Sequence, residues 1–302
     1  IRKVMMNVHM IKPNYIIDYF GRMEPENQLL CLHDLMRSNP IQNMNLIIEI
    51  AVKYASRIPI NELIKLFEKN SSHQGLFLFV NRIINSVEDP DIILKYIQAG
   101  VITNNFAEVQ RVIKDLDNYD PEKVLQFFLD NRLVDHRPLI LLCDKHDYIE
   151  KLTSYLWKNK LIKAIENYAI QIRPQNCPRV LAVLLDEDCE ESHIKQILNT
   201  VRGACPIEPL VEEFKKRHKL KIIQKFLEDR ESEGSHNTAL HNALAMIYIE
   251  NDKNPKDFLM NNKYYDSKVV GKYCEERDPH LACIAYRRAA GACDDEFISL
   301  TN

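Results

Sequence analysis

The chain is poor in glycine, and this scarcity limits the folds that are open to it. It contains 7 glycines among 302 residues, and no two of them lie within a dozen residues of each other. Phosphate-binding loops of the GxGxxG and GxxxxGK[ST] types need several glycines in one short segment, because the backbone must approach the phosphate closely. An all-β chain needs many tight turns with positive φ. With 46% hydrophobic residues, the chain is therefore expected to be all-α.

Hydrophobic residues recur with the period of an α-helix almost throughout the chain. One stripe, at positions i, i+3, i+4 and i+7, consists of Ile60, Leu63, Ile64 and Phe67. Similar stripes lie within residues 148–156 and 240–248. Each predicted helix has about 10 to 15 residues, which is at or below the length at which an isolated helix is marginal in water. Each helix must therefore be stabilised by its neighbours.

Capping residues followed by proline mark the starts of several predicted helices. Asp89-Pro90, Asp120-Pro121 and Asp278-Pro279 each place aspartate at the N-cap and proline at the first helical position. Asn254-Pro255 is expected to do the same with asparagine. The side-chain oxygen accepts hydrogen bonds from the first backbone N–H groups, and proline has no N–H to leave unpaired.

Prolines also recur with a period near 30. Pro59, Pro90 and Pro121 are each 31 residues apart, and so are Pro178 and Pro209. A period of this length that contains two short helices is typical of an α-solenoid. We count about twenty helices, and predict a right-handed α-solenoid of about ten stacked helical hairpins. No stretch resembles a linker, so residues 1–302 are expected to form a single continuous segment.

Charge, hydropathy and cysteine content exclude several other classes. The balance of 40 Lys and Arg against 43 Asp and Glu does not indicate a nucleic-acid partner. The longest apolar runs, residues 139–143 and 180–185, are about a third of a membrane span. The 8 cysteines include no CxxC pair and are expected to be reduced, mostly buried thiols. The first residue is Ile1, so the sequence is interpreted as a piece of a longer chain.

Two clusters were considered as metal sites. The densest acidic run spans residues 186–191, but it lacks the nearby glycine of a calcium-binding loop. We interpret it as a loop leading into the acidic first turn of a helix that begins near Glu190. The second candidate set is Cys274, His280, Cys283 and Cys293. Its spacing does not fit a compact zinc site, and structural roles are predicted.

Two histidine-containing segments were considered as sites of chemistry. His236 and His241 are five residues apart, so they do not share a helical face as an i, i+4 metal pair would. Residues 144–147 read Asp-Lys-His-Asp, but no nucleophile or oxyanion loop accompanies them. Both segments are interpreted as polar residues of hairpin loops. No catalytic, cofactor-binding or metal-binding residue is assigned, no cofactor is predicted, and the chain is not expected to be an enzyme.

A single basic cluster remains. It consists of Lys215, Lys216, Arg217, His218, Lys219 and Lys221. It could bind a phosphoinositide headgroup or an acidic partner. The favoured interpretation is a helix C-terminus followed by a tight turn, because cations there complement the helix dipole. Glu212 and Glu213 lie one turn earlier and could pair with these cations.

The most specific stretch is residues 264–286, which read YYDSKVVGKYCEERDPHLACIAY. This stretch resembles the clathrin heavy chain almost residue for residue. The likeness extends over essentially the whole chain, through Pro13 and residues 18–21, 75–77, 89–91, 95–99, 184–186, 201–203, 241–245 and 247–249. Residues 287–293 form a segment that is about two residues longer than is usual in that family, so the register after Tyr286 is left open.

The resemblance implies a segment of the distal heavy-chain leg that contains about two clathrin heavy-chain repeats. The implied function is that of a structural scaffold, which self-assembles with other clathrin heavy-chain legs into the polyhedral coat of coated pits and coated vesicles. The implied location is the cytoplasmic face of those membranes, in endocytosis and other vesicle-mediated, intracellular protein transport. Light chains and adaptors would bind the parent chain through regions absent here. No nucleic acid and no direct membrane insertion are expected.

The alternative is a helical-repeat subunit of another vesicle tethering or sorting complex, which would use the same repeat without forming a coat. An enzyme or peptide receptor on this scaffold would need polar residues that converge in one groove, and the sequence contains no such set.

Overall fold

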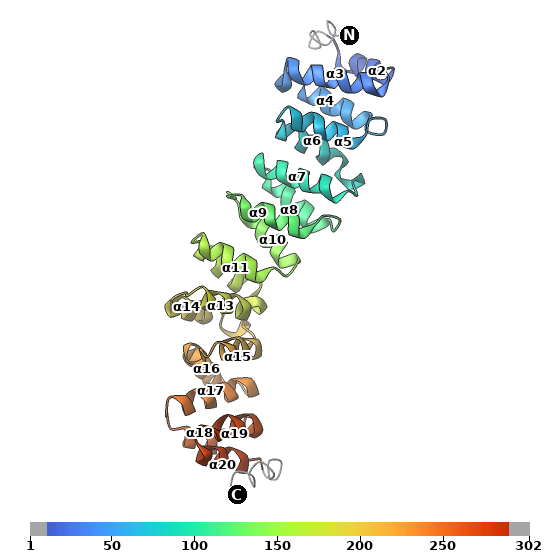
Figure 1. The fold of residues 1–302 in the computed structure, drawn as a ribbon. Coiled ribbons are helices and arrows are strands. Elements are labelled where there is room, and N and C mark those ends of the chain that lie inside the picture. Colours follow the sequence, from blue (N-terminus) through green and yellow to red (C-terminus); the bar gives the residue numbers. More distant parts are fainter. Residues whose placement is uncertain (1–10, 290–302) are drawn as a thin grey trace. The chain divides into compact units, whose positions relative to one another are not determined.

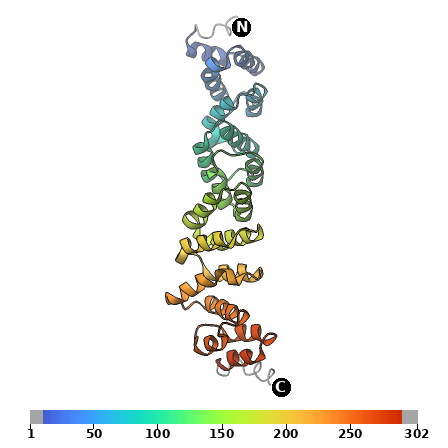
Figure 2. The ribbon, with the colours of Figure 1, turned by 90° about the vertical axis from the view of Figure 1, so that its left-hand side faces the viewer.

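The computed structural model describes residues 11–289, and within this range the chain forms α-helices and short helical turns with no β-strand (Figure 1). Contacts divide it into two compact units, Ile1–Asp147 and Tyr148–Asn302. In each unit short helices stack one upon the next (Figure 2). The predicted all-α repeat fold is confirmed.

The first unit contains nine described helices. They are α2 (Pro13–Gly21), α3 (Pro25–Ser38), α4 (Pro40–Lys53), α5 (Ile60–Lys69), α6 (His73–Ile83), α7 (Pro90–Ile102), α8 (Phe106–Asp115), α9 (Pro121–Asp130) and α10 (Arg137–Lys145). A 3-10 turn, Ile84–Ser86, follows α6. Helices two apart in the chain contact each other, as α2 with α4, α4 with α6, and α8 with α10. This alternation produces two layers of helices.

The second unit repeats the arrangement with ten described helices. They are α11 (Ile149–Lys158), α12 (Ile162–Asn167), α13 (Cys177–Asp186), α14 (Glu191–Val201), α15 (Ile207–Lys216), α16 (Gln224–Ser232), α17 (Thr238–Glu250), α18 (Pro255–Asn261), α19 (Ser267–Glu275) and α20 (Pro279–Arg287). Short helical turns lie at Tyr168–Ile172, Pro174–Asn176, Arg202–Ala204 and Leu220–Ile223. One layer runs through α11, α13, α15, α17 and α19, each in contact with the next.

The predicted hydrophobic stripes form the interfaces between the layers. In α5, Leu63, Ile64 and Phe67 are fully buried. Each such side chain stabilises the fold by about 1.5–3 kcal/mol. In α17, Leu244 is fully buried, and the helix contacts helices on several sides, namely α15, α16, α18 and α19. The stripes therefore hold together helices that would be unstable alone.

The three predicted aspartate caps are present. Asp89 accepts a hydrogen bond from the backbone N–H of Asp91, and Asp120 and Asp278 each accept two such bonds from the first turns of α9 and α20. For Asn254-Pro255, proline is the first residue of α18 as predicted, but the capping role of Asn254 is wrong. Its side chain makes no capping hydrogen bond, and its backbone is left-handed with φ 44°. Asparagine tolerates this conformation better than most residues, so here it supplies a turn instead of a cap.

Several helices of this chain end in left-handed residues that are not glycine. Ser71, Asn104, Lys160, Asp188 and His218 have φ between 51° and 60°. At each, the next residue donates its N–H to a carbonyl five residues back, as from Lys219 to Phe214 at 2.9 Å. This is the Schellman pattern of helix termination. Among the described glycines, only Gly234 has a positive φ.

Gly271 has a different role, which is the close packing of two helices. A Cβ atom at this position would lie 2.3 Å from the Tyr286 ring. The absence of a side chain lets α19 approach α20 closely, and the Tyr286 hydroxyl then donates a hydrogen bond to Glu275 at 2.5 Å. The stretch that resembles clathrin is thus a tightly packed helical hairpin.

Cysteine burial agrees with the sequence expectation. Among the described residues, the buried free thiols are Cys31, Cys143, Cys177, Cys189, Cys205 and Cys274, whereas Cys283 is partly exposed. Burial raises the pKa of Cys274 to about 11, so this thiol is protonated at neutral pH. Cys293 and most of the segment after Tyr286 lie outside the described residues.

We expect Lys160→Gly to stabilise the chain. A side chain in the left-handed region costs about 1–2 kcal/mol, and part of the gain is lost because glycine is more flexible in the unfolded state. The free energy of unfolding, measured by denaturant titration, should rise by about 0.5–1 kcal/mol. The matched control Lys272→Gly, at an exposed position within α19, should lower it by about 1 kcal/mol. Equal destabilisation by both variants would contradict the proposed role of the turn.

We expect Leu244→Pro to destabilise the second unit severely. Proline inside α17 removes a backbone hydrogen bond and costs about 3 kcal/mol or more, and a fully buried leucine is lost as well. Far-UV circular dichroism and thermal unfolding measure the effect. Thr238→Pro is the control, since it occupies the first position of the same helix, where proline is tolerated. Unchanged helicity and melting in Leu244→Pro would refute the expectation.

Candidate functional site

Polar side chains connect equivalent positions of successive hairpins. Lys123 donates to Asp91 at 3.0 Å, 32 residues away, and Arg217 donates to Asp186, 31 residues away. Other links of the same kind are Arg179 to Glu150, Gln196 to Glu166, Ser154 to Glu187 and Asn262 to Glu231. We call these contacts the inter-hairpin links. Their separations reproduce the period near 30 that the prolines indicated.

Arg217 forms a link that contains several hydrogen bonds. Its guanidinium donates to both carboxylate oxygens of Asp186, at 2.8 and 2.6 Å, and to Glu213 at 2.7 Å. The hydrogen bond from Arg217 is the main reason why the pKa of Asp186 lies below its usual range. The pair joins the C-terminal end of α15 to that of α13, and its bidentate geometry fixes their spacing.

Lys145 forms a second link, at the end of α10. Its ammonium group donates to the backbone carbonyls of Ile113 at 2.9 Å and Leu116 at 2.7 Å. It also pairs with Asp117 at 2.7 Å. These carbonyls lie in and just after the last turn of α8, where a cation complements the helix dipole. Lys145 therefore caps a neighbouring helix.

The interpretation of residues 144–147 as loop residues is corrected by this result. Asp144 and Lys145 belong to the last turn of α10, and His146 is its C-cap. The Nε2 atom of His146 lies 2.8 Å from the hydroxyl of Tyr119. Burial lowers the pKa of His146. The segment thus ends one helix and contacts another.

His241 also differs from the expected loop residue. It lies within α17 and is 2% exposed. Its Nε2 is 2.9 Å from the carbonyl of Ser235, and its Nδ1 is 2.9 Å from the amide nitrogen of Asn262. His236 and His241 both contact the ring of Tyr264. The spacing of the two histidines does not indicate this grouping, because its third member, Tyr264, comes from the loop before α19.

The described members of the candidate zinc set, Cys274, His280 and Cys283, do not form one site. Cys274 is fully buried in the hydrophobic core between α17 and α20, whereas His280 and Cys283 line a separate surface pocket. His280 is the second residue of α20, as predicted. Within residues 11–289, no group of three or more His, Cys, Asp or Glu side chains is arranged to hold a metal ion.

The acidic run adopts the predicted arrangement. Asp186 ends α13, Asp188 is the left-handed residue of the turn, and α14 begins at Glu191. Glu187 accepts hydrogen bonds from Ser154 at 2.8 Å and pairs with Lys158 at 3.2 Å. The acidic residues therefore contribute to inter-hairpin links.

The basic cluster is also placed as predicted. α15 ends at Lys216, Arg217 is its C-cap, and His218 is left-handed with φ 55°. Lys216 pairs with Glu212 and Glu213, at 3.0 and 3.1 Å. Lys219 and Lys221 follow the turn, and both are exposed.

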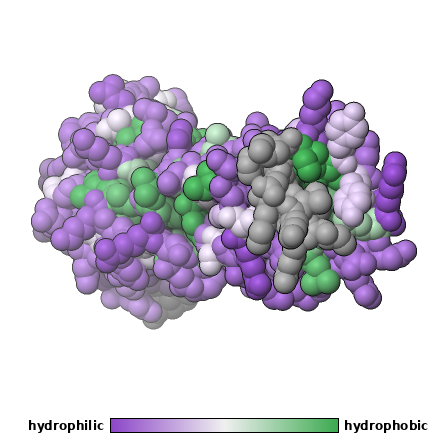
Figure 3. Space-filling model, turned by 90° about the horizontal axis from the view of Figure 1, so that it is seen from above, coloured by the Kyte–Doolittle hydropathy of each residue, from purple (hydrophilic) through white to green (hydrophobic). Residues whose placement is uncertain are grey.

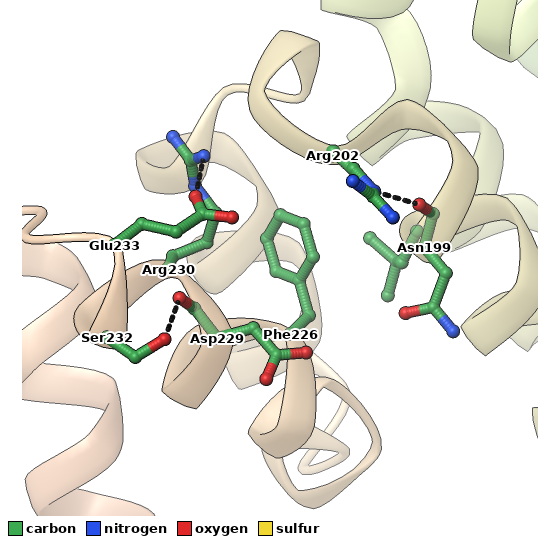
Figure 4. A pocket seen from close by; sticks show the side chains of 8 residues that line it. Asn199, Arg202, Phe226, Asp229, Arg230, Ser232 and Glu233 are labelled. Carbon is green, nitrogen blue, oxygen red and sulfur yellow. Dashed lines mark hydrogen bonds and ion pairs between the residues drawn. The ribbon is translucent and has the colours of Figure 1, made fainter.

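The second unit contains several pockets that are open to solvent. The pocket in Figure 4 has a volume of about 460 Å³, and two arginines that line it are engaged with neighbouring residues. Arg230 pairs there with Glu233 at 2.6 Å, and Arg202 donates to the carbonyl of Asn199. The face shown in Figure 3 is largely hydrophilic, with hydrophobic residues in small groups. This described surface suits weak contacts better than chemistry.

We expect the contribution of the Arg217–Asp186 pair to depend on pH. Because the folded-state pKa of Asp186 is lowered, its stabilisation is present above the unfolded value of about 3.9 and is lost as pH falls through the folded value. Asp186→Asn should lower the free energy of unfolding at pH 7 by at most about 1 kcal/mol, since the carboxylate is half-exposed. The difference from wild type should vanish towards pH 2. Glu276→Gln is the control, and a pH-independent difference for Asp186→Asn would contradict this account.

Comparison with known proteins gives consistent results. The family described as "Region in Clathrin and VPS" matches residues 51–192 and 198–302. The chain is 43% identical over 303 residues to a clathrin heavy chain of Dictyostelium discoideum, and 41% identical over 302 residues to clathrin heavy chain 2 of Homo sapiens. A probable clathrin heavy chain of Schizosaccharomyces pombe is 39% identical over 302 residues.

These alignments cover 100% of this chain but 18% of each relative. The chain thus spans about a fifth of the length of the curated relatives that it matches. Within residues 11–289, no helix has both the length and the hydrophobicity required to span a bilayer. Because this family matches most of the chain, the chain belongs to the family of helical repeat regions found in clathrin and VPS proteins.

Proposed function

We propose that the chain is a segment of a clathrin heavy-chain leg and acts as a structural scaffold in the polyhedral coat of coated pits and coated vesicles. The observation that carries this proposal is the identity of 41–43% over the full length of the chain to heavy chains as distant as those of Dictyostelium and human. The relatives named here are clathrin heavy chains, which favours a coat over a tethering complex of the VPS type.

The domain organisation in this proposal is one continuous run of about two repeats. The family matches twice, over residues 51–192 and 198–302, and this supports two repeats. The boundary between the compact units, at Asp147 and Tyr148, falls inside the first match. Compact units and repeats therefore do not coincide, as expected when hairpins are added one after another.

The proposed mechanism is mechanical. Each hairpin contacts mainly its neighbours, so a bend is distributed over many small interfaces. Exposed ion pairs contribute about 0–1 kcal/mol each, so a single surface substitution should have little effect. Many weak contacts between aligned legs would add up through avidity and remain reversible. Coat formation needs this combination of stiffness over one hairpin and adaptability over several.

The partners in this proposal are other heavy-chain legs. Light chains and adaptors would bind the parent protein elsewhere. The corresponding location is the cytoplasmic face of coated membranes.

Segment replacement tests this function. A Dictyostelium clathrin heavy chain whose matching segment is exchanged for residues 1–302 should assemble into cages, as seen by sedimentation and electron microscopy. The same chimera with Leu244→Pro should lose assembly, and the Thr238→Pro chimera should retain it.

The outcome that would refute the proposal is a chimera that is folded and trimeric but forms no cages. Circular dichroism and analytical ultracentrifugation distinguish this result from misfolding of the chimera.

A further inference from the structure

A cavity of about 550 Å³ opens on the second unit beside the start of α14, the turn after α15 and the first turns of α16. Its lining includes four lysines and a histidine, which are Lys195, Lys219, Lys221, Lys225 and His218. The volume is within the range of small-molecule sites. Lys195 and Lys225 pair with Glu191 and Asp229, at 3.0 and 2.7 Å, so the cavity combines room for a compact ligand with the excess positive charge of Lys219 and Lys221.

The two carboxylates that line the cavity are already engaged. Glu191 lies 3.0 Å from Lys195. Glu228 accepts hydrogen bonds from Gln224, Tyr248 and Lys253, at 2.9, 3.1 and 3.0 Å. Burial raises the pKa of Glu228, but these hydrogen bonds outweigh it and the net shift is downward. Glu228 is therefore ionised and held by groups on its own side of the cavity.

Lys219 and Lys221 differ from the cations that precede them. Lys216 and Arg217 each pair with carboxylates of the same helix or of α13. Within residues 11–289, neither Lys219 nor Lys221 has a carboxylate oxygen within 4.0 Å. Both line one cavity beside the left-handed turn at His218. Two like charges held at one cavity repel each other, and a bound anion would convert this repulsion into attraction.

The lining also indicates the class of anion. It contains no Phe, Tyr or Trp side chain, its one ring is the imidazole of His218, and its apolar member is Ile222. A nucleobase would find no phenyl, phenol or indole ring on which to stack. Lysine binds phosphate as a point charge, and several lysines around one cavity suit a ligand with phosphates on several sides. We propose that this cavity binds a polyphosphorylated inositol, free or as a lipid headgroup, mainly through Lys219 and Lys221. This site is independent of the proposed coat function.

Isothermal titration calorimetry of the 302-residue chain with inositol hexakisphosphate tests the proposal. We expect binding that weakens as salt is raised, because ions screen these exposed charges. The double variant Lys219→Ala/Lys221→Ala should bind about ten-fold or more weakly, since each charge-assisted hydrogen bond contributes at least that factor. Both positions are exposed, and circular dichroism verifies that the variant is folded.

The control Lys215→Ala/Lys272→Ala makes the same change in net charge outside the cavity. Equal losses of affinity in the two double variants would contradict the proposed site, because binding would then depend only on the net charge of the chain. Binding of ATP as tight as that of inositol hexakisphosphate would overturn the ligand class. Vesicles that contain phosphatidylinositol 4,5-bisphosphate distinguish a lipid headgroup from a free inositol phosphate. Binding to the vesicles that requires Lys219 and Lys221 supports the lipid headgroup. Binding of the soluble ligand alone supports the free inositol phosphate. If the chain binds neither inositol hexakisphosphate nor these vesicles, the proposal is refuted.

Discussion

The structure depends on the mutual packing of helices that are too short to be stable alone. α12 has 6 residues and α18 has 7, well below the length at which an isolated helix is stable in water. These helices are held by buried apolar side chains such as Ile165 in α12 and Leu259 in α18, as α5 is by Leu63, Ile64 and Phe67. Because each helix is held by its neighbours, the fold can be extended by adding hairpins, and stability accumulates along the chain.

Helix termination sets the geometry of this stack. Several helices end with left-handed residues such as Asp188 and His218 in place of glycine. The residues just before these turns carry the inter-hairpin links: Glu187 precedes Asp188 and contacts Ser154, and Arg217 precedes His218 and contacts Asp186. The same turn at His218 leads into the cavity lined by Lys219 and Lys221. One local motif thus ends a helix, spaces the hairpins and forms a charged surface.

Local signals in the sequence predicted the helices well. They did not predict the environment of a side chain whose contacts come from a distant part of the chain. The aspartate–proline caps and the acidic start of α14 were predicted correctly, because a cap acts within three residues of its own position. Asn254 was wrongly assigned as a cap, since asparagine suits both a cap and a left-handed turn. His241 was expected in a loop, yet it is buried against Ser235 and Asn262. Its environment depends on a contact 21 residues away, which spacing within one helix does not indicate.

The sequence alone was sufficient for the helical class, the period near 30 and the family resemblance of residues 264–286, since these follow from local hydrophobic order, capping and residue identity. The tertiary structure decided which polar groups meet. It assigned Lys145 to the carbonyls at the end of α8, Arg217 to Asp186, and left Lys219 and Lys221 without carboxylate partners in the described chain. The physical reason is that a side chain's partner across a hairpin depends on the exact rotation and spacing of two packed helices, and these are fixed only when the buried stripes interlock.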